Sequence, residues 1–333
     1  MEKLSQLVPK GVNDLHGEDF EVKEQTIIKL KNLFKQYEYK QIQTPVFEYY
    51  DLFYKIEGTL NKDQMIKLID TDGKILVLRP DATIPIARMV AQNYQNADPV
   101  QRFSYVTSIF RMNEDLQNIQ SREFTQAGVE LFGKNGVEAD VEIISLAIES
   151  LQEVGVVNFT IDIGQANFFK KLVEQIDLPK EAMNDIQRLI EDKNFAQLKK
   201  NVNELAIDEE LKNALRTIPT LYGEPEEVFR RAFQIAINNE MTDEIQHLKA
   251  VYEKLVAKGY EQYLSLDLGL INHLNYYTSI VFQGFITGYG SPVLLGGRYD
   301  NLTKQFGYDT KAIGFAIYVD RLIESLNGNK GGA

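Results

Sequence analysis

Residues 101–133, "QRFSYVTSIFRMNEDLQNIQSREFTQAGVELFG", contain two alternating stretches separated by a polar segment. Small and apolar side chains form one face of the second stretch: Thr125, Ala127, Val129 and Leu131. The opposite face carries Gln126, Gly128 and Glu130. Because successive side chains of a strand point to opposite faces, we expect the apolar face to pack under helices and the polar face to line a cleft.

The polar face contains a gap at its centre. Gln126 and Glu130 stand about 13 Å apart at ~3.3 Å per residue, with the glycine Gly128 between them. A small polar ligand fits such a gap, and a solvent-facing sheet edge with an incidental glycine fits the pattern equally well. The first stretch is apolar on both faces, which predicts a central strand.

Helices are predicted on both sides of this pair in the sequence. Apolar residues recur at helical spacing near residues 19–38. The run "KILVLRP" (74–80) reads as a strand that ends at a proline, and a helix follows with Asp81 or Thr83 as its cap and Pro85 in its first turn. Later strands are expected at 263–286 and 293–295, then a turn "GGRYD" (296–300), a short helix, and a strand that leads into a helix over 311–326.

The pattern of apolar and charged residues divides the sequence into three regions. Residues 165–258 consist of helical patterns with charged outer faces, which predicts a helical insertion. Residues 1–164 and 259–326 would then form one domain around the strands. The tail 327–333, "NGNKGGA", lacks large apolar residues and is expected to be disordered.

Composition narrows the classes of function. The formal net charge of -12 disfavours binding to a nucleic-acid backbone. The chain contains no cysteine, so disulfides, thiolate metal sites and thiol nucleophiles are excluded, and its three histidines are too scattered to predict a metal site. With no signal-peptide pattern and no long apolar run, we expect a cytoplasmic protein.

Three arginines near element edges are candidates for anion recognition: Arg111, Arg298 and Arg321. A planar guanidinium suits carboxylate and phosphate groups, although each arginine taken singly also fits a surface ion pair. The sequence contains neither a Walker-type loop, nor a G-x-S-x-G elbow, nor a dinucleotide-binding glycine fingerprint.

Seven segments together resemble the catalytic domain of histidyl-tRNA synthetase in order and approximate spacing. They are "PKGVNDL" (9–15), "TPVFEYYDLF" (44–53), "LRPDATIPIARMVA" (78–91), "FRMNEDLQNIQSREFTQAGVELFG" (110–133), "NYYTSIVF" (275–282), "GGRYDNL" (296–302) and "AIGFAIYVDRL" (312–322). The resemblance implies an α+β fold of class II synthetase type: a six- or seven-stranded antiparallel sheet flanked by helices, with a helical insertion and a dimer built on the first motif.

The amino-acid pocket of that family matches this sequence at seven positions. The resemblance implies histidine binding by Asp81, Thr83, Arg111, Gln126, Glu130, Tyr276 and Tyr277. Asp81 is a shortened version of the glutamate in the family. Carboxylates can accept hydrogen bonds from the ammonium group of the ligand, while tyrosine and glutamate can hold an imidazole at both nitrogens.

Departures from the synthetase pattern argue against catalysis, and no catalytic residue or cofactor is expected. Asn272 and His273 stand where the family has the arginine and glycine of its Arg-Gly-Leu-Asp-Tyr-Tyr motif. The loop "MNEDLQNIQSRE" (112–123) is acidic where the synthetase loop is basic, and either Asn113 or Glu114 takes the place of the adenine-contacting glutamate. The sequence also ends near "DRLIESL", so we expect no anticodon-binding domain.

A synthetase-like sequence that keeps the amino-acid pocket but lacks the catalytic arginine resembles the regulatory subunits of ATP phosphoribosyltransferase in histidine biosynthesis. This resemblance implies a non-catalytic protein with a dimeric core that joins a short catalytic subunit in a hetero-octamer, activates it and takes part in feedback by L-histidine. Arg111, Arg298 and Arg321 then remain candidates for residual nucleotide or phosphate contacts.

Two alternatives belong to other classes of protein. A stand-alone enzyme that activates histidine for a carrier other than tRNA would use Arg111 and Arg321 for ATP, but Asn272 and the acidic loop oppose adenylate chemistry. A tRNA-binding accessory protein would need a basic surface, which the net charge disfavours.

Overall fold

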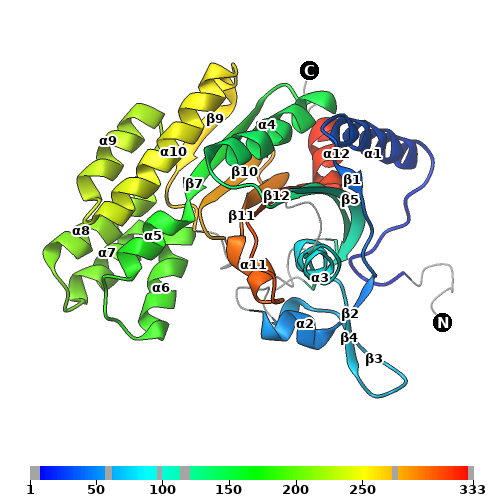
Figure 1. Ribbon diagram of the computed structural model, residues 1–333, viewed down its shortest axis with the longest axis horizontal. Helices are drawn as coiled ribbons and strands as arrows, with labels where there is room; N and C mark the ends of the chain where they lie inside the picture. Colours follow the sequence, from blue (N-terminus) through cyan, green and yellow to red (C-terminus); the bar gives the residue numbers. More distant parts are fainter. Residues whose placement is uncertain (1–7, 57–61, 96–99, 113–120, 272–276, 329–333) are drawn as a thin grey trace.

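The computed structural model describes residues 8–56, 62–95, 100–112, 121–271 and 277–328 of this chain. Its centre is a nine-stranded sheet with the order β1-β5-β6-β12-β11-β10-β7-β9-β8. A smaller sheet, ordered β2-β4-β3, lies at the bottom of Figure 1. The elements divide into twelve strands and twelve α-helices within the described residues.

The strands have the following bounds: β1 Lys40–Gln41, β2 Phe47–Tyr49, β3 Lys67–Ile69, β4 Ile75–Leu78, β5 Gln101–Phe110, β6 Glu123–Phe132, β7 Phe159–Gln165, β8 Tyr222–Gly223, β9 Leu264–Asp267, β10 Ile280–Ile286, β11 Leu294–Arg298 and β12 Ala312–Tyr318. The helices have these bounds: α1 Glu18–Gln36, α2 Tyr50–Lys55, α3 Thr83–Asn93, α4 Val137–Glu153, α5 Ala166–Val173, α6 Lys180–Glu191, α7 Phe195–Glu204, α8 Glu209–Thr217, α9 Pro225–Ile235, α10 Asn239–Ala257, α11 Asp300–Lys304 and α12 Val319–Gly328.

Most of the predicted elements are confirmed. The two alternating stretches form β5 and β6, which pair antiparallel along their whole length. The sheet differs from the expected one in two ways: it has nine strands, and it is mixed, since β1 pairs with β5 and β7 pairs with β9 in parallel. The strands β1 and β8 have only two residues each, too few to show the alternation that identifies longer strands, whereas β9 lies within the range 263–286 where strands were expected.

The segment "GGRYD" was expected to be a turn, and this expectation is wrong. Gly296, Gly297 and Arg298 are the last residues of β11, paired with β12 on one side, and only Tyr299 and Asp300 leave the strand. A pair of glycines favours a turn in isolation. Here neighbouring side chains occupy the space that a side chain at either glycine would fill, which makes the glycines necessary within the sheet.

Helices cover both faces of the large sheet. In Figure 1, α1, α4 and α12 lie above it and α3 and α11 lie below it. The predicted apolar face of β6 packs with α1 and α4, because Ala127, Val129 and Leu131 are fully buried in the core that contains these helices. The opposite face of the sheet contributes to a second core with α3, which leaves room there for polar side chains of β6.

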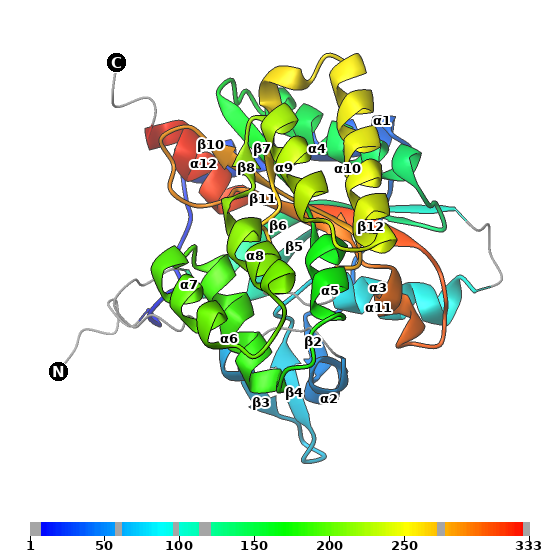
Figure 2. The same cartoon turned by 90° about the vertical axis from the view of Figure 1, so that its left-hand side faces the viewer.

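The helices α5 to α10 form a layer beside the sheet, which faces the viewer in Figure 2. They run from Ala166 to Ala257, within the predicted insertion 165–258, and the short strand β8 interrupts them. Buried side chains of these helices belong to the same apolar core as α1 and α4. The division of the chain into a core domain and an insertion stays a prediction.

Helix α12 extends to Gly328, two residues into the segment expected to be disordered, and residues 329–333 lie outside the described residues. Among the helices of the described residues, none combines the length and apolar character needed to cross a membrane.

A buried ion cluster connects three distant parts of the fold. Asp140 of α4 is fully buried and accepts hydrogen bonds from Arg298 of β11, at 3.0 Å from Nε and 2.6 Å from Nη2. His247 of α10 lies 2.7 Å from the other carboxylate oxygen of Asp140, and Asp300 receives a further bond from Arg298. The cluster therefore fixes the end of β11 and the start of α11 against the helices.

We predict that Asp140→Asn lowers the free energy of unfolding by about 3 kcal/mol, because it leaves the buried Arg298 without its main counter-charge. Urea unfolding of the two proteins measures the difference. Asp185→Asn is the control, since Asp185 pairs with Arg188 on an exposed surface of α6 and should change stability by less than about 0.5 kcal/mol. Equal, small effects of both substitutions would contradict the structural role of the cluster.

Candidate functional site

On the cleft face of the large sheet, one row of paired residues contains three glycines. Glu130 of β6 pairs with Gly314 of β12, Gly314 with Gly297 of β11, Gly297 with Val281 of β10, and Val281 with Gly164 of β7. A Cβ on Gly314 would overlap the carboxylate of Glu130, and one on Gly297 would stand 2.6 Å from the ring of Tyr277. These glycines therefore make room for functional side chains above the sheet.

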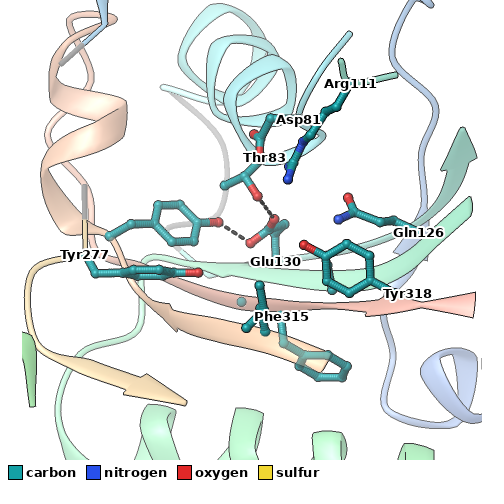
Figure 3. Close-up of a pocket in the computed structure, with 12 residues that line it drawn as sticks. Asp81, Thr83, Arg111, Gln126, Glu130, Tyr277, Phe315 and Tyr318 are labelled. Atoms are coloured by element: carbon teal, nitrogen blue, oxygen red, sulfur yellow. Dashed lines mark hydrogen bonds between the residues drawn. The ribbon is translucent and has the colours of Figure 1, made fainter. Parts of the chain in front are cut away.

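Glu130 lies at the centre of the site (Figure 3) and is 1% exposed. Thr83 donates a hydrogen bond to its Oε1 at 2.9 Å, and the hydroxyl of Tyr299 donates to its Oε2. Burial raises the pKa of Glu130 to about 8, against the opposing effect of these two bonds. Glu130 therefore favours its protonated form in the folded protein, and the stability of the fold decreases as pH rises from about 4.5 to about 8.

Asp81 and Thr83 enter the site at the start of α3. Asp81 Oδ1 accepts a hydrogen bond at 2.9 Å from the backbone N–H of Ile84 in the first turn of α3. The N-cap position itself is Ala82, which is neither of the two predicted cap residues. Burial raises the pKa of Asp81, while the positive charge of Arg111 lowers it. The charge of Asp81 in turn raises the pKa of Glu130. Two buried carboxyl groups thus share one small space, an arrangement that a cationic ligand would stabilise.

Arg111, Gln126 and Tyr318 form the other end of the site, to the right in Figure 3. Arg111 Nε donates to the backbone carbonyl of Pro80 at 2.7 Å, and its guanidinium lies 5.6 Å from the centre of the Phe124 ring. Gln126 is 4% exposed. This end offers hydrogen-bond donors and can meet the negative end of a ligand.

The gap expected at Gly128 is filled. A Cβ on Gly128 would stand 2.7 Å from the hydroxyl of Tyr105 and would overlap the backbone carbonyl of Phe315. The glycine therefore accommodates the Tyr105 ring from the neighbouring strand β5. The ligand place that the sequence suggested between Gln126 and Glu130 is taken at this point by a side chain of the protein.

The structure brings together six of the seven predicted histidine-binding residues around one cavity: Asp81, Thr83, Arg111, Gln126, Glu130 and Tyr277. Tyr276 lies outside the described residues, as do Asn272, His273, Asn113 and Glu114. Tyr277 is fixed by the ammonium group of Lys170 of α5, which donates to its backbone carbonyl.

The other two arginines of the predicted phosphate set have different surroundings. Arg298 does not line the cavity, and its guanidinium is 4% exposed and bound to Asp140 and Asp300, so a role in phosphate contact is not supported by its position. Arg321 donates to the carbonyl of Pro292 and lies 4.5 Å from the centre of the Tyr318 ring, next to the cavity.

Sequence reasoning missed several lining residues: Leu295, Tyr299, Gly314, Phe315, Ala316 and Tyr318. The segments "GGRYDNL" and "AIGFAIYVDRL" contain all except Leu295, but only their arginines were singled out. The Tyr299 hydroxyl donates to Glu130, and Gly314, which pairs with Glu130 across β6 and β12, leaves space for the Glu130 side chain. These contacts depend on the pairing of β6 with β12, which the sequence does not show.

The cavity is narrow, with a volume of ≈ 30 Å³ open to the centre of a water molecule. No group of acidic or histidine side chains in the described residues is arranged to hold a metal ion. The arrangement favours binding of a small ligand that carries a positive group for the carboxyl end and a negative group for the Arg111 end.

Comparison with known proteins shows the family and the fold of this chain. The family model of histidyl-tRNA synthetase matches residues 11–322. A relative from Oceanobacillus iheyensis, an ATP phosphoribosyltransferase regulatory subunit, is 43% identical over 306 residues, which is 92% of this chain and 74% of the relative.

Two solved structures share the fold. The protein from Bacillus halodurans described as an ATP phosphoribosyltransferase regulatory subunit/histidyl-tRNA synthetase superposes with a TM-score of 0.89 at 30% identity, covering 98% of this chain and 84% of the other. Histidyl-tRNA synthetase from a Nostoc species superposes with a TM-score of 0.81 at 18% identity, covering 98% of this chain and 77% of that one, which shows the fold alone. The class II synthetase-like fold is therefore confirmed, and this chain belongs to the family of ATP phosphoribosyltransferase regulatory subunits.

Proposed function

We propose that this chain is a non-catalytic regulatory subunit that activates the short catalytic subunit of ATP phosphoribosyltransferase and takes part in feedback by histidine in the cytoplasm. The observation that carries this proposal is a cavity centred on the buried Glu130 and lined by six of the predicted histidine-binding residues, in a chain of the regulatory-subunit family. Regulation through such a pocket needs only that histidine favours one state of the assembly over another.

The pocket chemistry supports L-histidine as the ligand. Glu130 and Asp81 can meet the imidazole and the ammonium group, and Arg111 can meet the carboxylate. Thr83 and Tyr299 satisfy the Glu130 carboxyl group in the empty protein. Histidine would therefore displace hydrogen bonds already made, which couples binding to a local change of shape.

Assembly into a hetero-octamer with a dimeric core remains part of the proposal. Exposed apolar side chains occur on the small sheet and on α1, among them Phe47, Tyr49, Ile69 and Phe20. Apolar surface of this kind is compatible with subunit contacts. Binding of tRNA is disfavoured by the formal net charge of -12.

The first prediction concerns histidine. Glu130→Ala should weaken histidine binding by at least ~30-fold, because removing one member of a buried charge pair costs about 2 to 5 kcal/mol. Calorimetry on the isolated chain and on the complex with the catalytic subunit measures the affinity. Glu123→Ala is the matched control, since Glu123 is an exposed carboxylate at the start of the same strand and should leave the affinity unchanged.

Circular dichroism must show that the Glu130→Ala protein is folded. Unchanged histidine affinity in both preparations would mean that the pocket does not bind histidine and that feedback is sensed on the catalytic subunit.

The second prediction concerns the partner. Mixed with the short catalytic subunit from the same organism, this chain should raise phosphoribosyltransferase activity and co-elute with that subunit as a larger species in size-exclusion chromatography. Alone it should have no such activity. A catalytic subunit that is fully active by itself, with no co-elution at micromolar concentration, would contradict the proposal.

The alternative enzyme is separated from this proposal by a third measurement. We expect no histidine-dependent exchange of pyrophosphate with ATP, because loss of a preorganised charged donor, here at Asn272, typically costs ~10²- to 10³-fold in rate. Exchange at ordinary enzyme rates by the wild-type chain would instead support a stand-alone histidine-activating enzyme.

A further inference from the structure

A second cavity lies beside the Glu130 pocket on the same face of the sheet. Across the strands, Ala316 of β12 pairs with Leu295 of β11, Leu295 with Gln283 of β10, and Gln283 with Asp162 of β7. Directly paired residues point to the same face, so this row leads from the first pocket into the second. Leu295 lines both cavities and forms the wall between them.

The second cavity is much larger than the first, with an open volume of ≈ 420 Å³. This size lies in the range of small-molecule sites. Its apolar lining consists of Leu270, Ile271, Phe285, Pro292 and Leu295, and its charged lining consists of Asp162, Glu191, Lys193 and Asp267. Three carboxylates against one lysine leave an excess of negative charge beside an apolar surface.

The two aspartates belong to the sheet and are held in place. Asp267, at the end of β9, is 5% exposed, and its Oδ1 accepts a hydrogen bond at 2.9 Å from the backbone N–H of Gly269. Asp162 is half-buried, and burial together with the charge of Asp267 raises its pKa. The charge of Asp267 therefore makes Asp162 harder to ionise, a conflict that an added cation would relieve.

One cation of the protein, the ammonium group of Lys193, already lies in this cavity, and the backbone of Lys193 has a positive φ that is unfavourable for a residue with a side chain. Lys193 follows α6 with φ of 50°, and the backbone N–H groups of Lys193 and Asn194 donate to the carbonyls of Ile190 and Leu189. This is the helix ending that favours glycine at the position of Lys193. The Lys193 ammonium nevertheless reaches Asp267 Oδ2 at 2.7 Å and lies 4.6 Å from the centre of the Tyr222 ring.

We propose that the second cavity is a binding site for a small organic cation that carries an amidinium, guanidinium or ammonium group on an apolar body. The positive group lies between Asp162 and Asp267, and the body packs against Phe285 and Leu295. Lys193 occupies part of the same negative field and competes with the ligand. This site is separate from the histidine pocket and does not depend on the function proposed above.

Benzamidine is a suitable probe because it joins a planar cation to an apolar ring. We expect calorimetry on the full chain to detect its binding, and neutral benzamide to bind at least about tenfold more weakly. Asp162→Asn should weaken benzamidine binding at least about tenfold, whereas Lys193→Gly should strengthen it, because the competing ammonium is removed and the backbone is relaxed.

Glu130→Gln locates the probe. We expect this substitution in the first pocket to leave benzamidine affinity unchanged, and Glu123→Gln, at an exposed carboxylate, to do the same. The proposal is overturned if Asp162→Asn and Lys193→Gly both leave the affinity unchanged, or if Glu130→Gln weakens it as much as Asp162→Asn does. Since histidine is absent from these measurements, failure here leaves the proposed function untouched, and failure of the proposed function leaves this site untouched.

Discussion

The site depends on one constraint: the Glu130 carboxyl group is buried on a face of the sheet where the neighbouring strands carry glycines. At position 314, on the neighbouring strand, a glycine is needed because any Cβ would overlap this carboxyl group. A glycine at position 297 likewise leaves room for the Tyr277 ring. Burying Glu130 without a cation costs free energy. This cost is reduced by hydrogen bonds from the hydroxyls of Thr83 and Tyr299 and by protonation of the carboxyl group, whose pKa is raised. The Glu130 carboxyl group is thus neutral below about pH 8.

The remaining fold serves to hold the groups around Glu130. Asp81 accepts a hydrogen bond from the first turn of α3, which carries Thr83, while the buried pair of Asp140 and Arg298 fixes the end of β11 and hence Tyr299. Lys170 of α5 holds the backbone of Tyr277. Each contact connects a wall of the pocket to a different helix. The Lys170–Tyr277 hydrogen bond and the cluster of His247, Asp140 and Arg298 connect the helical layer with the pocket.

Sequence reasoning predicted the parts of this arrangement that depend on local patterns. The alternation of β6 correctly separated the buried Ala127 and Val129 from the cleft-facing Gln126 and Glu130. It could not show that Tyr105 fills the space over Gly128, because that contact depends on the register between two strands. The family resemblance identified the pocket residues, and the larger neighbouring cavity had no sequence signal because its row crosses strands far apart in the chain.

The protonation state of Glu130 can be measured by carbon-13 NMR of protein labelled at the glutamate carboxyl carbons, with Glu130→Gln to assign the signal. The titration is followed with and without histidine. Without histidine we expect a midpoint near pH 8, since burial raises the pKa to about 8, and with histidine a lower midpoint, because the ligand supplies a positive group. A midpoint in the usual range of an exposed glutamate that histidine does not change would contradict this expectation.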